Sequence, residues 1–281
     1  MISPVSRRLL LVHAHPDDES ITTGATIARY AAEGAEVTVV TCTLGEEGEV
    51  MPDLCELEGL RAHAADQLGG YRVTELMAAC AALGVSRHHF LGGLGRWRDS
   101  GMAGTPSASH PRAFTGGSAD EQTAQLAEIL DQVEPQVVVT YDAFGGYGHP
   151  DHIRAHDITM AAATRAGSVE RVFHTVTSRN AVRAGLAALR AADDAVFDVP
   201  EDDELPTTPD EEITTVLDVA AYLPAKVAAL RAHATQLAVV DGDVPYFALT
   251  NGIAQPIPAK DCFVLAHGSG DGAGHDLFGG L

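Results

Sequence analysis

Residues 8–19 read RLLLVHAHPDDE and decide the fold of this chain. The apolar run at residues 8–13 is typical of a buried strand, and Pro16 restricts the backbone of the polar turn that follows. His15, Asp17 and Asp18 stand in this turn. Buried imidazole and carboxylate groups are costly unless a metal ion or a catalytic network satisfies them. The stretch therefore predicts a strand, a turn and a helix, with reactive groups at the carboxyl end of the strand.

A second stretch repeats this arrangement far along the chain. Residues 136–140 read QVVVT, and GGYGHPDH follows at residues 145–152. Ligands of open α/β sheets bind outside the carboxyl ends of the strands, which is where both turns would lie. We therefore expect His149 and His152 to join the first turn in one site, which we interpret as the mononuclear metal centre of a hydrolase.

Strand patterns and helix patterns alternate along the chain, which predicts an α/β fold. We expect a Rossmann-like, mostly parallel sheet flanked by helices, with a smaller C-terminal extension. The predicted strands cover residues 8–13, 36–43, 88–91, 136–140, 171–177, 213–218 and 262–266. The predicted helices cover residues 22–33, 56–68, 74–83, 120–133, 153–166 and 224–235.

The composition changes after the predicted core, which divides the chain into three parts. Residues 1–192 are expected to form the metal-dependent α/β core. Residues 193–212 contain ten acidic residues and are expected to form a solvated linker or loop. Residues 213–281 would complete the domain and the rim of the substrate site, with a Gly-rich tail that is expected to be loose from Gly268 until Leu277 and Phe278.

Charge and cysteine content limit the partners and the compartment. The formal net charge is -21 and the only lysines are Lys226 and Lys260, so nucleic acid and anionic membrane surfaces are not expected to bind. The four cysteines form no C-x-x-C pair, and no apolar run is long enough for a membrane span. We expect a cytoplasmic protein with reduced cysteines that acts on a small molecule and could form a homo-oligomer.

The two motifs offer more donors than one metal ion needs. Two histidines and one carboxylate with an open position are typical of catalytic zinc sites and also of non-haem iron(II) sites. Of two adjacent carboxylates, one would bind the metal and the other would lie beside a metal-bound water. His13 is expected to pack or to support a ligand, Glu19 to orient the following helix, and His156 to lie at the surface or in the core.

Several segments resemble one enzyme family. AHPDDE (14–19) and GHPDH (148–152) are similar to signatures of the LmbE-like deacetylases, which include the N-acetylglucosaminyl-phosphatidylinositol de-N-acetylases. The resemblance is strongest to the branch that acts on N-acetylglucosaminyl-inositol in mycothiol biosynthesis. It rests on TCTLGEEGEV (41–50), DQLGGYR (66–72), GRWRDSGMAGT (95–105) and ALRAHATQ (229–236).

The resemblance implies roles for individual residues. His15, Asp18 and His152 would be the ligands of one divalent metal per chain, zinc first and iron(II) as the alternative. Asp17 would be the general base. His149 would stabilise the oxyanion, oriented or charged by Asp151, with help from Tyr147. The implied contacts to the amidated amino-sugar substrate are Arg72, Asp99, Glu47, Met102 and Asn251.

The function expected from these observations is zinc-dependent removal of the acetyl group from N-acetylglucosaminyl-inositol. A mycothiol S-conjugate amidase or another N-acetyl-sugar deacetylase would use the same centre. A non-haem iron oxygenase is the alternative from a different class, because the same donors hold iron(II). The extra carboxylate and the parallel sheet favour the hydrolase.

Overall fold

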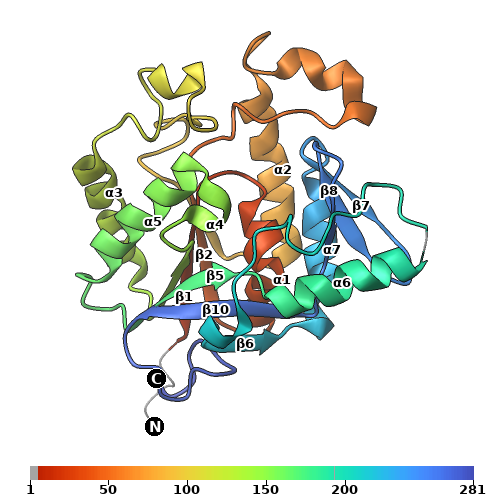
Figure 1. The fold of residues 1–281 in the computed structure, drawn as a ribbon. Helices are drawn as coiled ribbons and strands as arrows, with labels where there is room; N and C mark the ends of the chain where they lie inside the picture. The colour runs from red at the N-terminus through yellow and green to blue at the C-terminus, as the bar shows by residue number, and fades with distance from the viewer. Residues whose placement is uncertain (1–5, 193) are drawn as a thin grey trace.

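A computed structural model describes residues 6–192 and 194–281 (Figure 1). Seven strands form one sheet in the order β3-β2-β1-β4-β5-β10-β6. The first five strands of this order are parallel, while β10 is antiparallel to both of its neighbours. The predicted α/β fold with a mostly parallel sheet is therefore confirmed. The strands are β1 (Arg8–His13), β2 (Glu36–Thr41), β3 (Arg87–Phe90), β4 (Val137–Thr140), β5 (Arg171–Val176), β6 (Thr215–Asp218) and β10 (Lys260–His267).

Helices cover both faces of this sheet (Figure 1). Side chains alternate between the two faces of a strand, so Leu9 and Leu11 of β1 enter one apolar core while Leu10 and Val12 enter the other. The first core lies against α1 (Asp18–Ala32), α2 (Leu68–Leu83) and α7 (Leu223–Ala232). The second lies against α3 (Ala119–Val133) and α5 (Pro150–Ala163). None of the helices within the described ranges has the length and apolarity needed to cross a bilayer.

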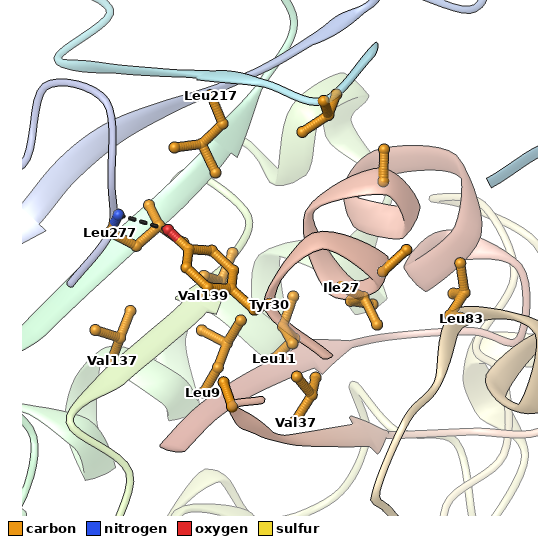
Figure 2. Close-up of a cluster of buried hydrophobic side chains, with 14 of the residues drawn as sticks. Leu9, Leu11, Ile27, Tyr30, Val37, Leu83, Val137, Val139, Leu217 and Leu277 are labelled. Atoms are coloured by element: carbon orange, nitrogen blue, oxygen red, sulfur yellow. Dashed lines mark hydrogen bonds between the residues drawn. The ribbon is translucent and has the colours of Figure 1, made fainter. Parts of the chain in front are cut away.

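The C-terminal tail is fixed against the first core, so the expectation of a loose tail is wrong. Figure 2 shows Tyr30 of α1 among the apolar side chains, with its hydroxyl accepting the backbone N–H of Leu277 at 2.7 Å. Arg171 is buried, and its guanidinium donates to four carbonyls of the tail, those of Ser269, Asp271, Leu277 and Gly279. Glycine content alone predicted mobility, but these carbonyls converge on one cation.

Several elements differ from the predicted ones. Residues 56–68 are not an α-helix, because Pro52 begins a 3-10 segment with non-helical φ and ψ at Leu54 and the chain then turns until residue 67. The sequence pattern also missed α6 (Arg179–Ala192) and a separate antiparallel sheet of β7 (Leu237–Val240), β8 (Tyr246–Leu249) and β9 (Ala254–Pro256). The short helical segments are η1 (Pro52–Leu60), η2 (Pro106–Ser109), α4 (Gly145–Gly148), η3 (Asp210–Glu212) and η4 (Ala220–Tyr222).

The part of the chain after residue 192 is attached at several places. β6 and β10 extend the main sheet, whereas α6 packs beside β9. The acidic segment touches this small sheet, because Asp198 N donates to Gly252 O at 3.0 Å and Asp198 O accepts Ala254 N at 2.8 Å. Asp193, where the expected linker begins, and residues 1–5 of the expected core lie outside the described residues.

Candidate active site

The two histidine motifs meet because β1 and β4 are neighbours in the sheet. The first motif lies between β1 and α1, and the second lies between β4 and α5. His15 Nδ1 lies 3.3 Å from His152 Nε2 and 3.5 Å from Asp18 Oδ2. The third distance, from His152 Nε2 to Asp18 Oδ2, is 3.4 Å. Three buried donor atoms thus form a nearly equilateral triangle.

This triangle fits a tetrahedral cation. At metal–ligand distances of about 2.0–2.1 Å, two ligand atoms of a tetrahedral site lie about 3.3 Å apart. Two other buried groups, His15 with His149 and His152 and His15 with Asp99 and Asp151, also have ligand atoms within 4.8 Å of one another. The His15–Asp18–His152 triangle fits better, because its three distances match the edge of a tetrahedron.

Neighbouring groups contact the second ring nitrogen of each histidine of the triangle. Asp151 Oδ2 lies 3.2 Å from His15 Nε2 and accepts the N–H of Ser100 at 2.9 Å. The carbonyl of Gly145 lies 3.1 Å from His152 Nδ1. Such partners fix the tautomer and the orientation of a ligating imidazole. The resemblance assigned Asp151 to His149, whereas in the structure its carboxylate contacts His15 and only its backbone N–H reaches His149.

Asp17 has a conformation and partners unlike those of Asp18. Its φ of 116° lies in a region that side chains rarely adopt and stores about 1–3 kcal/mol of strain. Its Oδ2 accepts a hydrogen bond from Arg72 at 2.9 Å. Burial raises the pKa of Asp17 to about 6, although the charge of Arg72 acts in the opposite direction. A carboxylate with such a pKa is suited to exchange protons near neutral pH.

Arg72 lies in α2, although the helices predicted over residues 56–68 and 74–83 left it in a loop between them, so that expected location is wrong. The helix begins at Leu68 and not at residue 74, which turns Arg72 inward. Besides Asp17, its guanidinium donates to the carbonyls of Pro16 and Gly45. The structure therefore brings Arg72 to Asp17 and not to an open rim.

His149 caps α5, and this contact assigns its proton. Its Nδ1 accepts the backbone N–H of Asp151 at 3.1 Å, so a neutral ring carries its hydrogen on Nε2. Burial, and then the neighbouring His15, lower the pKa of His149 to about 3. Its ring centroid lies 4.6 Å from that of His15. The site thus contains a neutral N–H donor beside the donor triangle.

Tyr147 stands on α4, at the mouth of the site. Its ring centroid lies 5.0 Å from that of His152, yet the residue is 50% exposed. The preceding Gly146 has a φ of 75°, so the backbone makes a kink inside this short helix. The phenol can therefore be reached by a substrate while its ring lies over the histidines.

Of the other predicted substrate residues, the described contacts join Asp99 to His15 and the backbone N–H of Glu47 to Asp99. Asp99 Oδ1 lies 3.5 Å from His15 Nε2, and Asp99 is buried. Glu47 binds Arg98 at 2.8 Å and Ser107 at 2.7 Å, which engages both of its oxygens. Met102 is exposed. Asn251 is exposed on the turn after β8, next to Thr250, whose hydroxyl donates to Glu49.

Two further features of the site were not found by sequence reasoning. Tyr141 stacks on His152 with ring centroids 4.1 Å apart, and its hydroxyl accepts the N–H of Ala14. Glu19 forms a fully buried pair with His233, although we expected it only to orient α1. His233 lies in one of the segments that carry the family resemblance, but no sequence pattern predicted its partner.

His13 and His156, which lie near the two motifs in sequence, fit the roles expected from the sequence. His13 is fully buried, and its Nε2 lies 3.1 Å from the hydroxyl of Thr23. His156 is half-buried, and its Nδ1 lies 2.9 Å from the carbonyl of Tyr141. Both are thus occupied by neighbours outside the donor triangle.

Comparisons with known proteins agree with the motifs. A protein named 1D-myo-inositol 2-acetamido-2-deoxy-alpha-D-glucopyranoside deacetylase, from Saccharomonospora viridis, is 63% identical over 97% of this chain and 100% of its own length. A protein of the same name from Actinosynnema mirum is 62% identical over 98% of this chain and 97% of its own length.

Solved structures share the fold at low sequence identity. N,N'-diacetylchitobiose deacetylase from Pyrococcus horikoshii is 19% identical, with a TM-score of 0.54 over 82% of this chain and 70% of that chain. GalB, a 4-carboxy-2-hydroxymuconate hydratase from Pseudomonas putida, is also 19% identical, with a TM-score of 0.52 over 80% of this chain and 78% of that chain. Because a hydratase shares the fold, the fold alone does not assign the reaction.

The family assignment rests on sequence. The family model described as PIG-L, GlcNAc-PI de-N-acetylase, matches residues 10–163, which contain both histidine motifs. The chain therefore belongs to the GlcNAc-PI de-N-acetylase family.

Proposed function

We propose that this protein removes the acetyl group from 1D-myo-inositol 2-acetamido-2-deoxy-alpha-D-glucopyranoside, the N-acetylglucosaminyl-inositol of mycothiol biosynthesis. The observation that carries the proposal is the donor triangle of His15, Asp18 and His152 beside a separate carboxylate, Asp17, with a pKa near neutral. The substrate follows from the names of relatives that are 63% and 62% identical over nearly their whole length.

His15, Asp18 and His152 would hold one divalent cation, for which we propose zinc. A bound zinc ion acidifies water and polarises a carbonyl oxygen, as amide hydrolysis requires. Iron(II) is the alternative that the same donors can bind. Asp151 would keep His15 in the tautomer that presents Nδ1, since its carboxylate faces Nε2.

Asp17 would be the general base. Arg72 engages Oδ2, so Oδ1 is the oxygen that would accept a proton from the attacking water. The same oxygen would return this proton to the amine as the bond between carbon and nitrogen breaks. Arg72 keeps the carboxylate in place during both transfers.

His149 and Tyr147 would stabilise the charge that develops on the acetyl oxygen. The pKa of the His149 ring is about 3, so the ring is neutral near pH 7. Its Nε2–H is then a hydrogen-bond donor without any change of protonation. Preorganised donors of this kind act most strongly in a buried site. Tyr147 would add a second donor from the mouth of the site.

Asp99, Glu47, Met102 and Asn251 would contact the sugar and the inositol. Arg72 would contribute indirectly, through its hydrogen bond to Asp17. We place the reaction in the cytoplasm, where Cys42, Cys55, Cys80 and Cys262 remain free thiols.

Acetate release tests the proposal directly. Purified protein is assayed with N-acetylglucosaminyl-inositol, with a mycothiol S-conjugate and with N-acetylglucosamine, after chelation and after addition of zinc or anaerobic iron(II). We expect metal-dependent acetate release with the first substrate to be fastest. Faster cleavage of the conjugate would make the protein an amidase, and oxygen consumption with iron(II) would favour an oxygenase.

A further inference from the structure

A buried hydrogen-bonded pair, Glu19 and His233, lies behind the base, and the proposed mechanism does not use it. His233 Nε2 lies 2.7 Å from Glu19 Oε1, and both side chains are fully buried. Glu19 follows Asp18 at the start of α1, whereas His233 ends α7, so the two residues are 214 positions apart. The pair joins the turn of the first motif to the C-terminal part of the chain.

Stability alone is a weak reason for such a pair. Removing a carboxylate and an imidazole from water costs free energy, and packed apolar residues of similar size often stabilise a fold as well or better. A buried pair of this kind is better explained if it holds a neighbouring group in a fixed position. The group that it positions is found through the second oxygen of Glu19.

Glu19 Oε2 accepts the backbone N–H of Asp17 at 3.0 Å. This is the residue whose φ is 116°, a conformation that persists only where its surroundings enforce it. Arg72 holds the other end of Asp17 by its Oδ2 at 2.9 Å. The base is thus gripped at its backbone by Glu19 and at its carboxylate by Arg72.

The contacts of Glu19 and Arg72 with Asp17 belong to one closed ring of contacts. Glu75 lies three residues after Arg72 on α2, and its carboxylate accepts Thr235 N at 2.8 Å and Thr235 Oγ1 at 2.7 Å. Thr235 lies two residues after His233. The ring therefore runs from Asp17 through Arg72, α2 and Glu75 to the 233–235 loop, and back through His233 and Glu19.

We propose that the Glu19–His233 pair positions Asp17 for proton transfer, so that His233 is a positioning residue for the reaction. The inference rests on the proposed function, because Asp17 matters only as the base. Loss of His233 would leave the hydroxyl of Ser20, 2.6 Å away, as the remaining side-chain partner described for Glu19 Oε1. The carboxylate of Glu19 would then be held less firmly, and the strained backbone of Asp17 would relax away from the attacking water.

The test compares His233→Ala with His233→Gln, whose amide can donate to Glu19 from about the place of the ring Nε2. We expect kcat of His233→Ala to fall about ten- to a hundredfold, with KM changed by less than about twofold and the metal content unchanged. His233→Gln should recover most of this loss. An unchanged kcat, a change confined to KM, or loss of the metal would overturn the proposal.

Lys226→Met is the matched control for lost stability. Lys226 lies on α7, the helix that His233 caps, it is also buried, and its Nζ lies 3.7 Å from Asp261 Oδ1. We expect it to lower Tm as His233→Ala does while kcat stays within about twofold. An equal fall in kcat in both variants would show a general structural effect and overturn the proposal.

Crystal structures separate this inference from the proposed function. If the wild-type protein releases no acetate, the proposed function fails, but the position of Asp17 can still be compared. We expect Asp17 of His233→Ala to leave its positive φ or to lose its contact with Arg72. An unmoved Asp17 would overturn the inference.

Discussion

Arg171 and Arg72 are both buried and both donate to backbone carbonyls, but they lie at opposite ends of the sheet. Arg171 begins β5, and its guanidinium binds four carbonyls of the tail. Arg72 lies beyond the carboxyl ends of β1 and β2, and it binds two carbonyls and the carboxylate of Asp17. Arg171 thus holds the C-terminal tail in place, whereas Arg72 holds the carboxylate of Asp17.

The partners of a buried arginine indicate whether its charge supports the fold or the site. Among the contacts described for Arg171, all are to backbone groups that cannot titrate. Arg72 instead contacts a strained residue whose pKa is shifted toward neutral, and its Nε is buried without a partner among the described residues. The following predictions test whether this distinction holds.

The largest effect is expected from Asp17→Asn. The amide keeps the shape of the side chain but cannot accept a proton, so kcat should fall about 10²- to 10⁴-fold while metal content stays unchanged. Turnover and elemental analysis of the purified variant check both parts. Loss of the metal would make Asp17 a ligand, and near-normal turnover would exclude it as the base.

His149→Ala should have the next largest effect. Removing one oxyanion donor typically lowers kcat about a hundred- to a thousandfold, and KM should change little. Steady-state kinetics separate the two constants. A change in KM alone would make His149 a substrate-binding residue.

Arg171→Met and Arg72→Met compare the two arginines directly. Arg171→Met leaves several buried carbonyls without their donor, so the free energy of unfolding should fall by on the order of 3 kcal/mol with kcat unchanged. Arg72→Met should lower kcat on both N-acetylglucosaminyl-inositol and N-acetylglucosamine, because it acts through Asp17. Denaturant titration and kinetics of both variants measure the contrast. A normal kcat in Arg72→Met would remove the distinction between them.

The pH profile should show an acidic limb that belongs to Asp17. The pKa of this acid is raised to about 6, so its basic form is lost as the pH falls through that value, and kcat/KM should then drop about tenfold per pH unit. A bound cation favours the charged carboxylate and moves the limb to lower pH. Measurement from about pH 4.5 to 8 tests this, and a limb above about pH 7 would contradict it.

The smallest effect is expected from Met102→Ala. The side chain is exposed near the site, so it can contact the distal part of a substrate without supporting the fold. We expect a two- to fivefold rise in KM for N-acetylglucosaminyl-inositol, or about 0.4–1 kcal/mol, and none for N-acetylglucosamine. Equal changes with both substrates would place Met102 near the reacting centre.

The sequence predicted the parallel half of the fold because its signals are local. Apart from β3, which reads RHHF, the strands there are short runs rich in apolar or β-branched residues, and both His-Pro-Asp turns follow such runs. Neighbouring carboxyl ends then bring the two turns together. In contrast, α6 buries Val182, Leu186 and Leu189 at helical spacing, but its other residues are mostly alanine and arginine, so the pattern was weak.

Contacts between distant residues explain what the sequence could not predict. Glu19 and His233 meet only because α7 packs against α1, and Arg171 finds its acceptors about a hundred residues later. Helix boundaries had a similar effect on Arg72, because α2 starts earlier than its apolar spacing indicated. The sequence shows which residue types are present, but tertiary packing decides which of these residues contact one another.

The position of β10 between β5 and β6 has a consequence for synthesis of the chain on the ribosome. The parallel strands are complete by residue 176, yet the outer edge of β5 is paired only by residues 260–267. An emerging chain therefore carries an open strand edge and an unsatisfied Arg171 until residues 260–279 have been synthesised. Chains that stop before residue 260 should be aggregation-prone and readily degraded in the cell.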